Sequence, residues 1–118
     1  MCGIAGALGE SDDGTLTDMI GCISHRGPDD SGKHFGDNFM IGMRRLSIVG
    51  VDSGHQPIHN EDEDVWTVFN GEIYNYEEIK ESLEEKGHEF YTEADTEVLV
   101  HLYEEYGEGF VEKLNGMF

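Results

Sequence analysis

The chain opens with Met1-Cys2-Gly3-Ile4-Ala5-Gly6, and this stretch decides how the rest of the sequence is interpreted. Removal of Met1, which a small second residue generally permits, leaves Cys2 with a thiol and a free α-amino group. An α-amine has a pKa of about 7.7 to 8, so near neutral pH it can accept the thiol proton directly or through one water. Cys2 is therefore a candidate nucleophile with its own base. The alternative is that Cys2 is a small apolar residue at the start of a buried strand.

The length and the cysteine and histidine patterns restrict the class of protein. A chain of 118 residues predicts one domain with one modest core. Its two cysteines, Cys2 and Cys22, have no spacing typical of a disulfide framework or a zinc site, and we expect Cys22 to be an inert core residue. His55 and His59 flank Pro57 and cannot share a helix face, and no His-Glu-x-x-His pattern occurs. The sequence thus predicts no metal site.

Charge and hydropathy argue against nucleic acid and membrane partners. The 26 acidic residues outnumber the 7 lysines and arginines, which gives a formal net charge of -19. Such a surface repels polyanions and anionic lipid. No apolar run approaches the roughly 18 residues of a membrane span, and the first ten residues lack the features of a secretory signal. We therefore expect a cytoplasmic location.

The acidic, lysine-poor composition also predicts adaptation to high salt. Screening weakens the repulsion among surface carboxylates, so we expect the free energy of unfolding to rise from low to molar salt. Urea denaturation at several salt concentrations measures this directly. A urea midpoint that stays constant or falls would exclude a halophilic origin.

Hydrophobic periodicity and turn residues predict the order of elements along the chain. Strands are expected over residues 3–8, 34–51, 65–69 and 88–92. Helices are expected over about 15–24, from an Asn75 N-cap to before Gly87, from an Asp95 N-cap to before Gly107, and over 109–114. The segments 24–32 and 56–64 are predicted to be loops.

Several polar residues allow both a structural and a ligand-binding role. Alternation along a strand sends Arg44 and Arg45 to opposite faces, and an inward arginine requires either a ligand carboxylate or a structural acid. Asn70-Gly71 is a common turn dipeptide, yet its amide and glycine N–H could also hold one oxyanion. Asp95 can cap a helix and still offer an oxygen to a ligand ammonium. A salt bridge is the structural expectation for Arg26.

Seven motifs, taken together and in order, resemble the N-terminal glutaminase domain of the glutamine-dependent asparagine synthetases. They cover essentially the whole chain and are Cys2-Gly3-Ile4-Ala5-Gly6, Arg26-Gly27-Pro28-Asp29-Asp30-Ser31-Gly32, Arg45-Leu46-Ser47-Ile48-Val49, Gln56-Pro57, Asn70-Gly71-Glu72-Ile73-Tyr74-Asn75, Asp95-Thr96-Glu97 and Asn115-Gly116-Met117-Phe118. The family departs from this sequence at Ala94, where serine or glycine is expected.

The resemblance implies an α+β fold, a four-layer αββα N-terminal-nucleophile hydrolase sandwich, and hydrolysis of L-glutamine to glutamate and ammonia. It implies that Cys2 is the nucleophile and that Asn70 and Gly71 bind the oxyanion. Arg45 would hold the substrate α-carboxylate, and Glu72 and Asp95 its α-ammonium. The backbone of Arg45, Leu46, Ser47, Ile48 and Val49 would line the pocket.

The resemblance further implies that residues 1–118 are the N-terminal part of a longer domain, truncated at the C-terminus. The absent synthetase domain would need ATP and magnesium and would use the ammonia to convert aspartate to asparagine, whereas the glutaminase domain needs no cofactor. Incomplete sheets would expose an apolar face that either pairs with a second copy or leaves the fragment marginally stable. The alternatives are a non-catalytic binding or assembly module derived from such a domain, and an amidotransferase for another acceptor.

Overall fold

The computed structural model describes residues 2–9, 12–46 and 54–118. The chain forms two units, the first comprising Met1–Pro57 and Val68–Asn70 and the second comprising Ile58–Thr67 and Gly71–Phe118. Both units combine helices with antiparallel strands, so the described residues have the predicted α+β composition. Among these residues, none of the helices has the length and apolar character of a membrane span.

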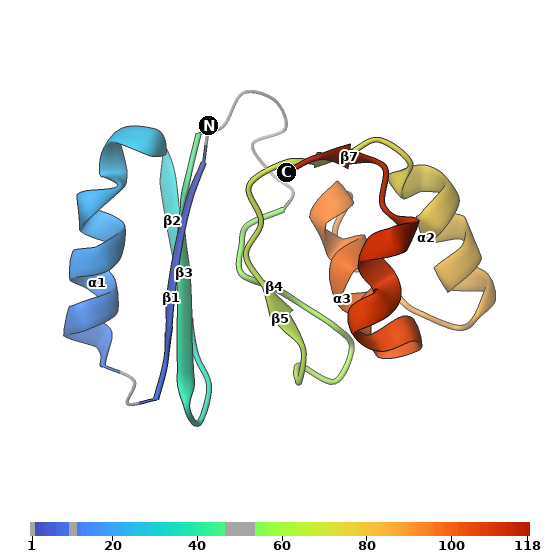
Figure 1. The fold of residues 1–118 in the computed structure, drawn as a ribbon, viewed down its shortest axis with the longest axis horizontal. Helices are drawn as coiled ribbons and strands as arrows, with labels where there is room; N and C mark the ends of the chain where they lie inside the picture. The colour runs from blue at the N-terminus through green and yellow to red at the C-terminus, as the bar shows by residue number, and fades with distance from the viewer. Residues whose placement is uncertain (1, 10–11, 47–53) are drawn as a thin grey trace. The chain divides into compact units, whose positions relative to one another are not determined.

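The first unit contains a three-stranded antiparallel sheet (Figure 1). The strands are β1 (Gly3–Leu8), β2 (Asp30–Phe35) and β3 (Phe39–Arg45), with β3 between the other two. Gly3 of β1 pairs with Arg44 of β3. The strand predicted over 3–8 is confirmed, and its register places Cys2 at the end of the sheet that carries both adjacent arginines.

Helix α1 (Asp13–Cys22) packs on one face of this sheet (Figure 1). Leu16 and Ile20, one turn apart, are buried in the cluster that joins the helix to the sheet. The helix begins two residues before the predicted range because the Asp12 carboxylate accepts the N–H of Thr15 at 2.7 Å, which satisfies a free donor of the first turn.

The prediction that Cys22 belongs to the core is wrong. Cys22 ends α1 and is exposed, because its position lies off the helix stripe that Leu16 and Ile20 define. A short 3₁₀ helix, η1 (Ser24–Arg26), follows it.

Instead of the single strand predicted over 34–51, residues 34–45 form the end of β2, a turn and β3, and residues 47–51 lie outside the described residues. Gly36 donates its N–H to the carbonyl of Phe39 at 2.9 Å and so closes a turn between β2 and β3. Strand β2 begins inside the predicted loop 24–32. Gly32 lies within it, and a Cβ there would come 1.7 Å from the Gln56 carbonyl oxygen. This glycine therefore permits close backbone approach and does not end a loop.

The second unit contains two short strand pairs and two packed helices (Figure 1). Strand β4 (Ile58–His59) pairs with β5 (Trp66–Thr67), and β6 (Glu72–Ile73) pairs with β7 (Gly116–Met117). The other elements are α2 (Tyr76–Glu85), η2 (Asp95–Glu97), α3 (Val98–Tyr106) and η3 (Gly107–Lys113). The buried apolar residues of the two α-helices are Ile79, Leu83, Val98, Leu99, Val100 and Leu102.

The helices of this unit follow the prediction more closely than its strands. Helix α2 starts after Asn75 as expected, but the Asn75 side chain bonds Lys113 and Asn115 and thereby fastens the segment before β7. The strand predicted over 65–69 is confirmed only at residues 66–67. Phe69 instead donates its N–H to the Gln56 side chain at 2.6 Å, away from any strand ladder.

Residues 88–92 were predicted to form a strand, but in the structure these described residues form none. Their backbone is held by the fully buried carboxylate of Glu97, which accepts the N–H of Tyr91 at 2.9 Å and that of Thr92 at 2.7 Å. Burial alone would raise the pKa of Glu97, but hydrogen bonds from His101, Thr92 and Tyr91 lower it. The Glu97 side chain therefore accepts backbone N–H groups that would bond a neighbouring strand if residues 88–92 were in a sheet.

Replacing Glu97 with glutamine should destabilise the chain by about 2 kcal/mol, because the amide keeps the volume but turns one acceptor into a donor that faces backbone N–H groups. Glu93→Gln is the matched control, since the Glu93 side chain is 84% exposed, and it should change stability by no more than about 0.5 kcal/mol. Urea denaturation measures both variants. Equal midpoints for the two variants would contradict the role given to Glu97.

Candidate active site

Cys2 lies half-buried just before β1, with a free thiol. Its carbonyl accepts the Nε–H of Arg26 at 3.2 Å, so η1 anchors the main chain beside the thiol. The next residue, Gly3, is buried, and a Cβ there would lie 3.0 Å from the Ile23 side chain. The position of the candidate nucleophile is thus determined by contacts from the segment that follows α1.

The two adjacent arginines have different surroundings. Arg44 donates its Nε–H to the carbonyl of Gly27 at 2.9 Å, which holds the loop after η1 against β3. Gly27 lies so close to this strand that a Cβ would come 2.3 Å from the Arg44 carbonyl carbon. Arg44 therefore has a structural role, which leaves Arg45 as the arginine with a candidate ligand role.

Arg45 lies opposite Asp30 in the β2–β3 register. The Asp30 carboxylate also contacts His55 Nδ1 at 2.7 Å and accepts the N–H of Ser31. Burial alone would raise the pKa of Asp30, but the His55 hydrogen bond, the Ser31 N–H and the charges of His55 and Arg45 lower it. The sequence left two possible partners for an inward arginine, a ligand carboxylate or a structural acid. Asp30 is a candidate for the structural acid beside Arg45.

The remaining predicted residues of the first unit are only partly described. Leu46 is half-buried directly after β3, and Asn70 is half-buried after Phe69. Ser47, Ile48 and Val49 lie outside the described residues, so the pocket backbone expected there stays a prediction.

In the second unit Asp95 lies beside β6, which contains Glu72 and directly follows Gly71. Asp95 accepts the N–H of Ile73 at 2.8 Å, which fixes its carboxylate beside β6. A Cβ on Gly71 would lie 2.5 Å from the Met117 carbonyl oxygen, so the close approach of the C-terminal segment requires glycine.

The predicted cap role of Asp95 is wrong. Ala94 occupies the N-cap position of η2, and Asp95 directs one carboxylate oxygen to β6. Glu72 is exposed beside it on β6. The two acidic groups proposed for a substrate ammonium therefore both lie at β6.

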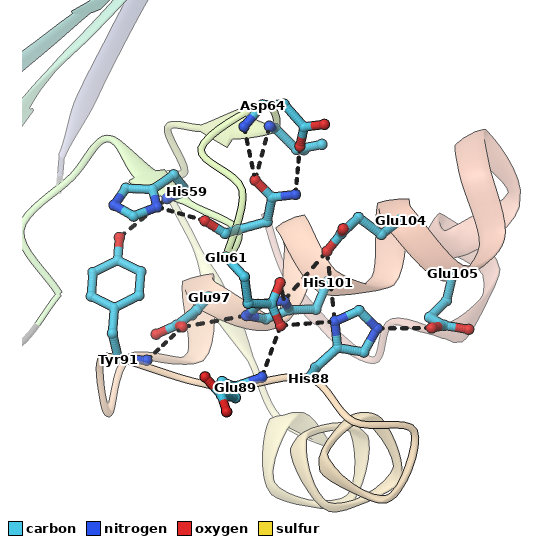
Figure 2. A network of polar contacts seen from close by, with 12 residues as sticks. His59, Glu61, Asp64, His88, Glu89, Tyr91, Glu97, His101, Glu104 and Glu105 are labelled. Carbon is cyan, nitrogen blue, oxygen red and sulfur yellow. Dashed lines mark hydrogen bonds and ion pairs between the residues drawn. The ribbon is translucent and has the colours of Figure 1, made fainter.

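A second polar arrangement was missed by the sequence analysis (Figure 2). Glu61, His88, His101 and Glu104 converge from three separate segments of the second unit. Burial alone would raise the pKa of Glu61, but the N–H groups of Glu61 and Glu89 and the charges of His101 and His88 lower it to about 2. Glu61 lies in the predicted loop 56–64 and is exposed, yet its carboxylate contacts both histidines.

The family model of the glutamine amidotransferase domain matches residues 1–118. The chain belongs to the glutamine amidotransferase domain family. It is 47% identical to asparagine synthetase [glutamine-hydrolyzing] 2 of Oryza sativa subsp. japonica, over 100% of this chain and 20% of the relative. It is 44% identical to asparagine synthetase [glutamine-hydrolyzing] 1 of Bacillus subtilis, again over 100% of this chain and 20% of the relative.

A nodule asparagine synthetase of Pisum sativum gives a similar result, with 46% identity over 100% of this chain and 21% of the relative. This amidotransferase chain therefore spans about a fifth of the length of the curated relatives it matches. The resemblance stated from the motifs is confirmed at the level of the family.

Proposed function

We propose that this amidotransferase domain hydrolyses L-glutamine to glutamate and ammonia through a thioester on Cys2. The observation that carries the proposal is the family match along the whole chain, in which the second residue is a cysteine. The half-buried thiol and its Arg26-anchored main chain are compatible with a positioned nucleophile.

The proposed reaction begins after Met1 is removed. The Cys2 α-amine takes the thiol proton, and the sulfur attacks the side-chain carbonyl carbon of glutamine. The Asn70 amide and the Gly71 N–H donate to the resulting oxyanion. Collapse of this intermediate breaks the C–N bond, and the α-ammonium returns its proton to the departing nitrogen, which leaves as ammonia. Water, deprotonated by the same amine, then hydrolyses the thioester to glutamate.

Charge complementarity supports the proposed orientation of the substrate. An amino acid needs a cation at its carboxylate and acidic groups at its ammonium. Arg45 supplies the first, with the backbone over residues 45–49 beside it, and Glu72 and Asp95 supply the second. In this assignment the Asp95 oxygen that does not accept from Ile73 faces the ammonium.

We extend the proposal to the longer protein that the relatives represent. Their names describe glutamine-hydrolysing asparagine synthetases, so the ammonia would convert aspartate to asparagine in a synthetase domain that uses ATP and magnesium. The αββα hydrolase sandwich and pairing with a second copy belong to the same proposal.

A coupled assay of glutamate and ammonia release tests the proposal without ATP or acceptor. The chain, with removal of Met1 verified by mass, should release the two products in equal amounts from L-glutamine and none from D-glutamine. A folded, processed chain that binds L-glutamine but releases neither product would support a non-catalytic binding module instead.

A further inference from the structure

The cluster in Figure 2 joins segments that are far apart in the sequence. Glu61 lies in the loop between β4 and β5, His88 follows α2, and His101 and Glu104 are one turn apart on α3. Their nearest ligand atoms all lie within 4.8 Å of one another. All four residues belong to the second unit, and none has a role in the proposed hydrolysis.

The spacing of the donor atoms fits a small tetrahedral cation. Glu61 Oε1 lies 3.1 Å from His88 Nδ1, and its other oxygen, Oε2, lies 3.2 Å from His101 Nδ1. Glu104 Oε2 lies 3.6 Å from His88 Nδ1 and 3.7 Å from His101 Nδ1. A tetrahedral Zn²⁺ with ligands at about 2.0–2.1 Å separates neighbouring donors by about 3.3 Å. The four distances lie close to this value.

A buried nitrogen without a hydrogen bond faces the centre of the cluster. His101 is fully buried, and within the described residues its Nδ1 has no hydrogen-bond partner despite the two nearby carboxylates. A buried polar atom of this kind is costly unless it is protonated or bound to a ligand. Either a bound cation or a proton on His101 Nδ1 would satisfy this atom.

The outer nitrogens of both histidines contact further carboxylates. His101 Nε2 lies 3.3 Å from Glu97, and His88 Nε2 lies 2.8 Å from Glu105 (Figure 2). A metal-binding histidine usually donates its other ring N–H to a carboxylate, which fixes the tautomer and directs the free lone pair at the metal. Both rings have this arrangement, with Nδ1 toward the cluster and Nε2 toward an acid.

We propose that Glu61, His88, His101 and Glu104 bind one Zn²⁺ ion per chain in a structural site. Two imidazole nitrogens and two carboxylate oxygens form a closed tetrahedral donor set suited to zinc. The ion would link the β4–β5 loop and the segment after α2 to α3. The competing arrangement is a metal-free network of imidazolium and carboxylate groups.

Titration of the metal-free chain with zinc chloride, followed by calorimetry in excess Mg²⁺, tests the site. The wild type should bind one equivalent, and its melting temperature should rise with zinc because the ion binds the folded state. His88→Gln and the more accessible Glu104→Gln should each weaken zinc binding by at least about tenfold. Glu108→Gln, an exposed change of equal charge in the following segment η3, should not alter zinc affinity.

Each other outcome overturns the proposal. Absence of saturable zinc binding by the folded wild type would assign the cluster to the metal-free network. Equal affinity in wild type, His88→Gln and Glu104→Gln would assign any bound zinc to the acidic surface. Because Glu104 lies on the exposed side of α3, its variant tests the site even where a histidine variant fails to fold.

Discussion

Replacing Cys2 with alanine should lower the rate of glutamine hydrolysis by at least about 10⁴-fold, because no other group supplies the attacking sulfur in the proposed reaction. Glutamine affinity should change little, since the proposed contacts to the substrate ends come from Arg45, Glu72 and Asp95. Glutamate release and binding calorimetry measure the two quantities on the same preparation.

The matched control for this change is Cys22→Ala. Cys22 is exposed at the end of α1, so its variant should keep wild-type turnover and stability. Substantial hydrolysis by Cys2→Ala would exclude the thioester. Equal loss in the two variants would instead indicate damage to the first unit.

Replacing Asn70 with alanine should lower kcat by about 10²–10³-fold, equivalent to about 3 kcal/mol of transition-state stabilisation. The oxyanion forms only during the reaction, so KM should stay within a few-fold of the wild-type value. Asn70→Asp keeps the size but removes the N–H donor, and should lose a similar amount of kcat. Steady-state kinetics of glutamate release provides both parameters.

Asn38→Ala is the control for this pair, since Asn38 is exposed in the β2–β3 turn. It should leave kcat and KM unchanged. A rise in KM with unchanged kcat in both Asn70 variants would assign Asn70 to substrate binding and contradict its oxyanion role.

The sequence predicted those elements whose signals are local. The apolar run after Cys2 forms β1, and the helical stripes ending at Gly87 and Gly107 form α2 and α3. Glycine after a helix is a strong stop signal, and both of these glycines have positive φ. Local pattern was sufficient for these elements.

Predictions failed where a group outside the segment determines its local structure. Residues 88–92 include Phe90, Tyr91 and Thr92, residue types common in strands, but a buried carboxylate on Glu97 holds their backbone. Gly32 was predicted to end a loop. It lies within β2 instead, and the backbone of Gln56 packs against it. Neither contact has a signature in the neighbouring sequence.

The residues of the candidate active site could be proposed from the sequence, whereas the histidine cluster could not, because only the former lie in local motifs. Family resemblance supplied the proposed roles of Cys2, Asn70 and Arg45 because those residues lie in recognisable motifs. His88 and His101 are thirteen positions apart and share no metal-binding spacing with Glu61, so only the fold brings their nitrogens together. A site assembled from separated single residues cannot be found by spacing alone.

The most direct test of the central claim is the intact mass of the chain before and after reaction with a diazoketone analogue of glutamine, followed by peptide mapping. We expect loss of Met1 and one covalent adduct on Cys2, with labelling prevented by excess L-glutamine. A processed, folded chain that stays unlabelled, or carries the adduct on Cys22, would contradict the assignment of Cys2 as the nucleophile of a glutamine site.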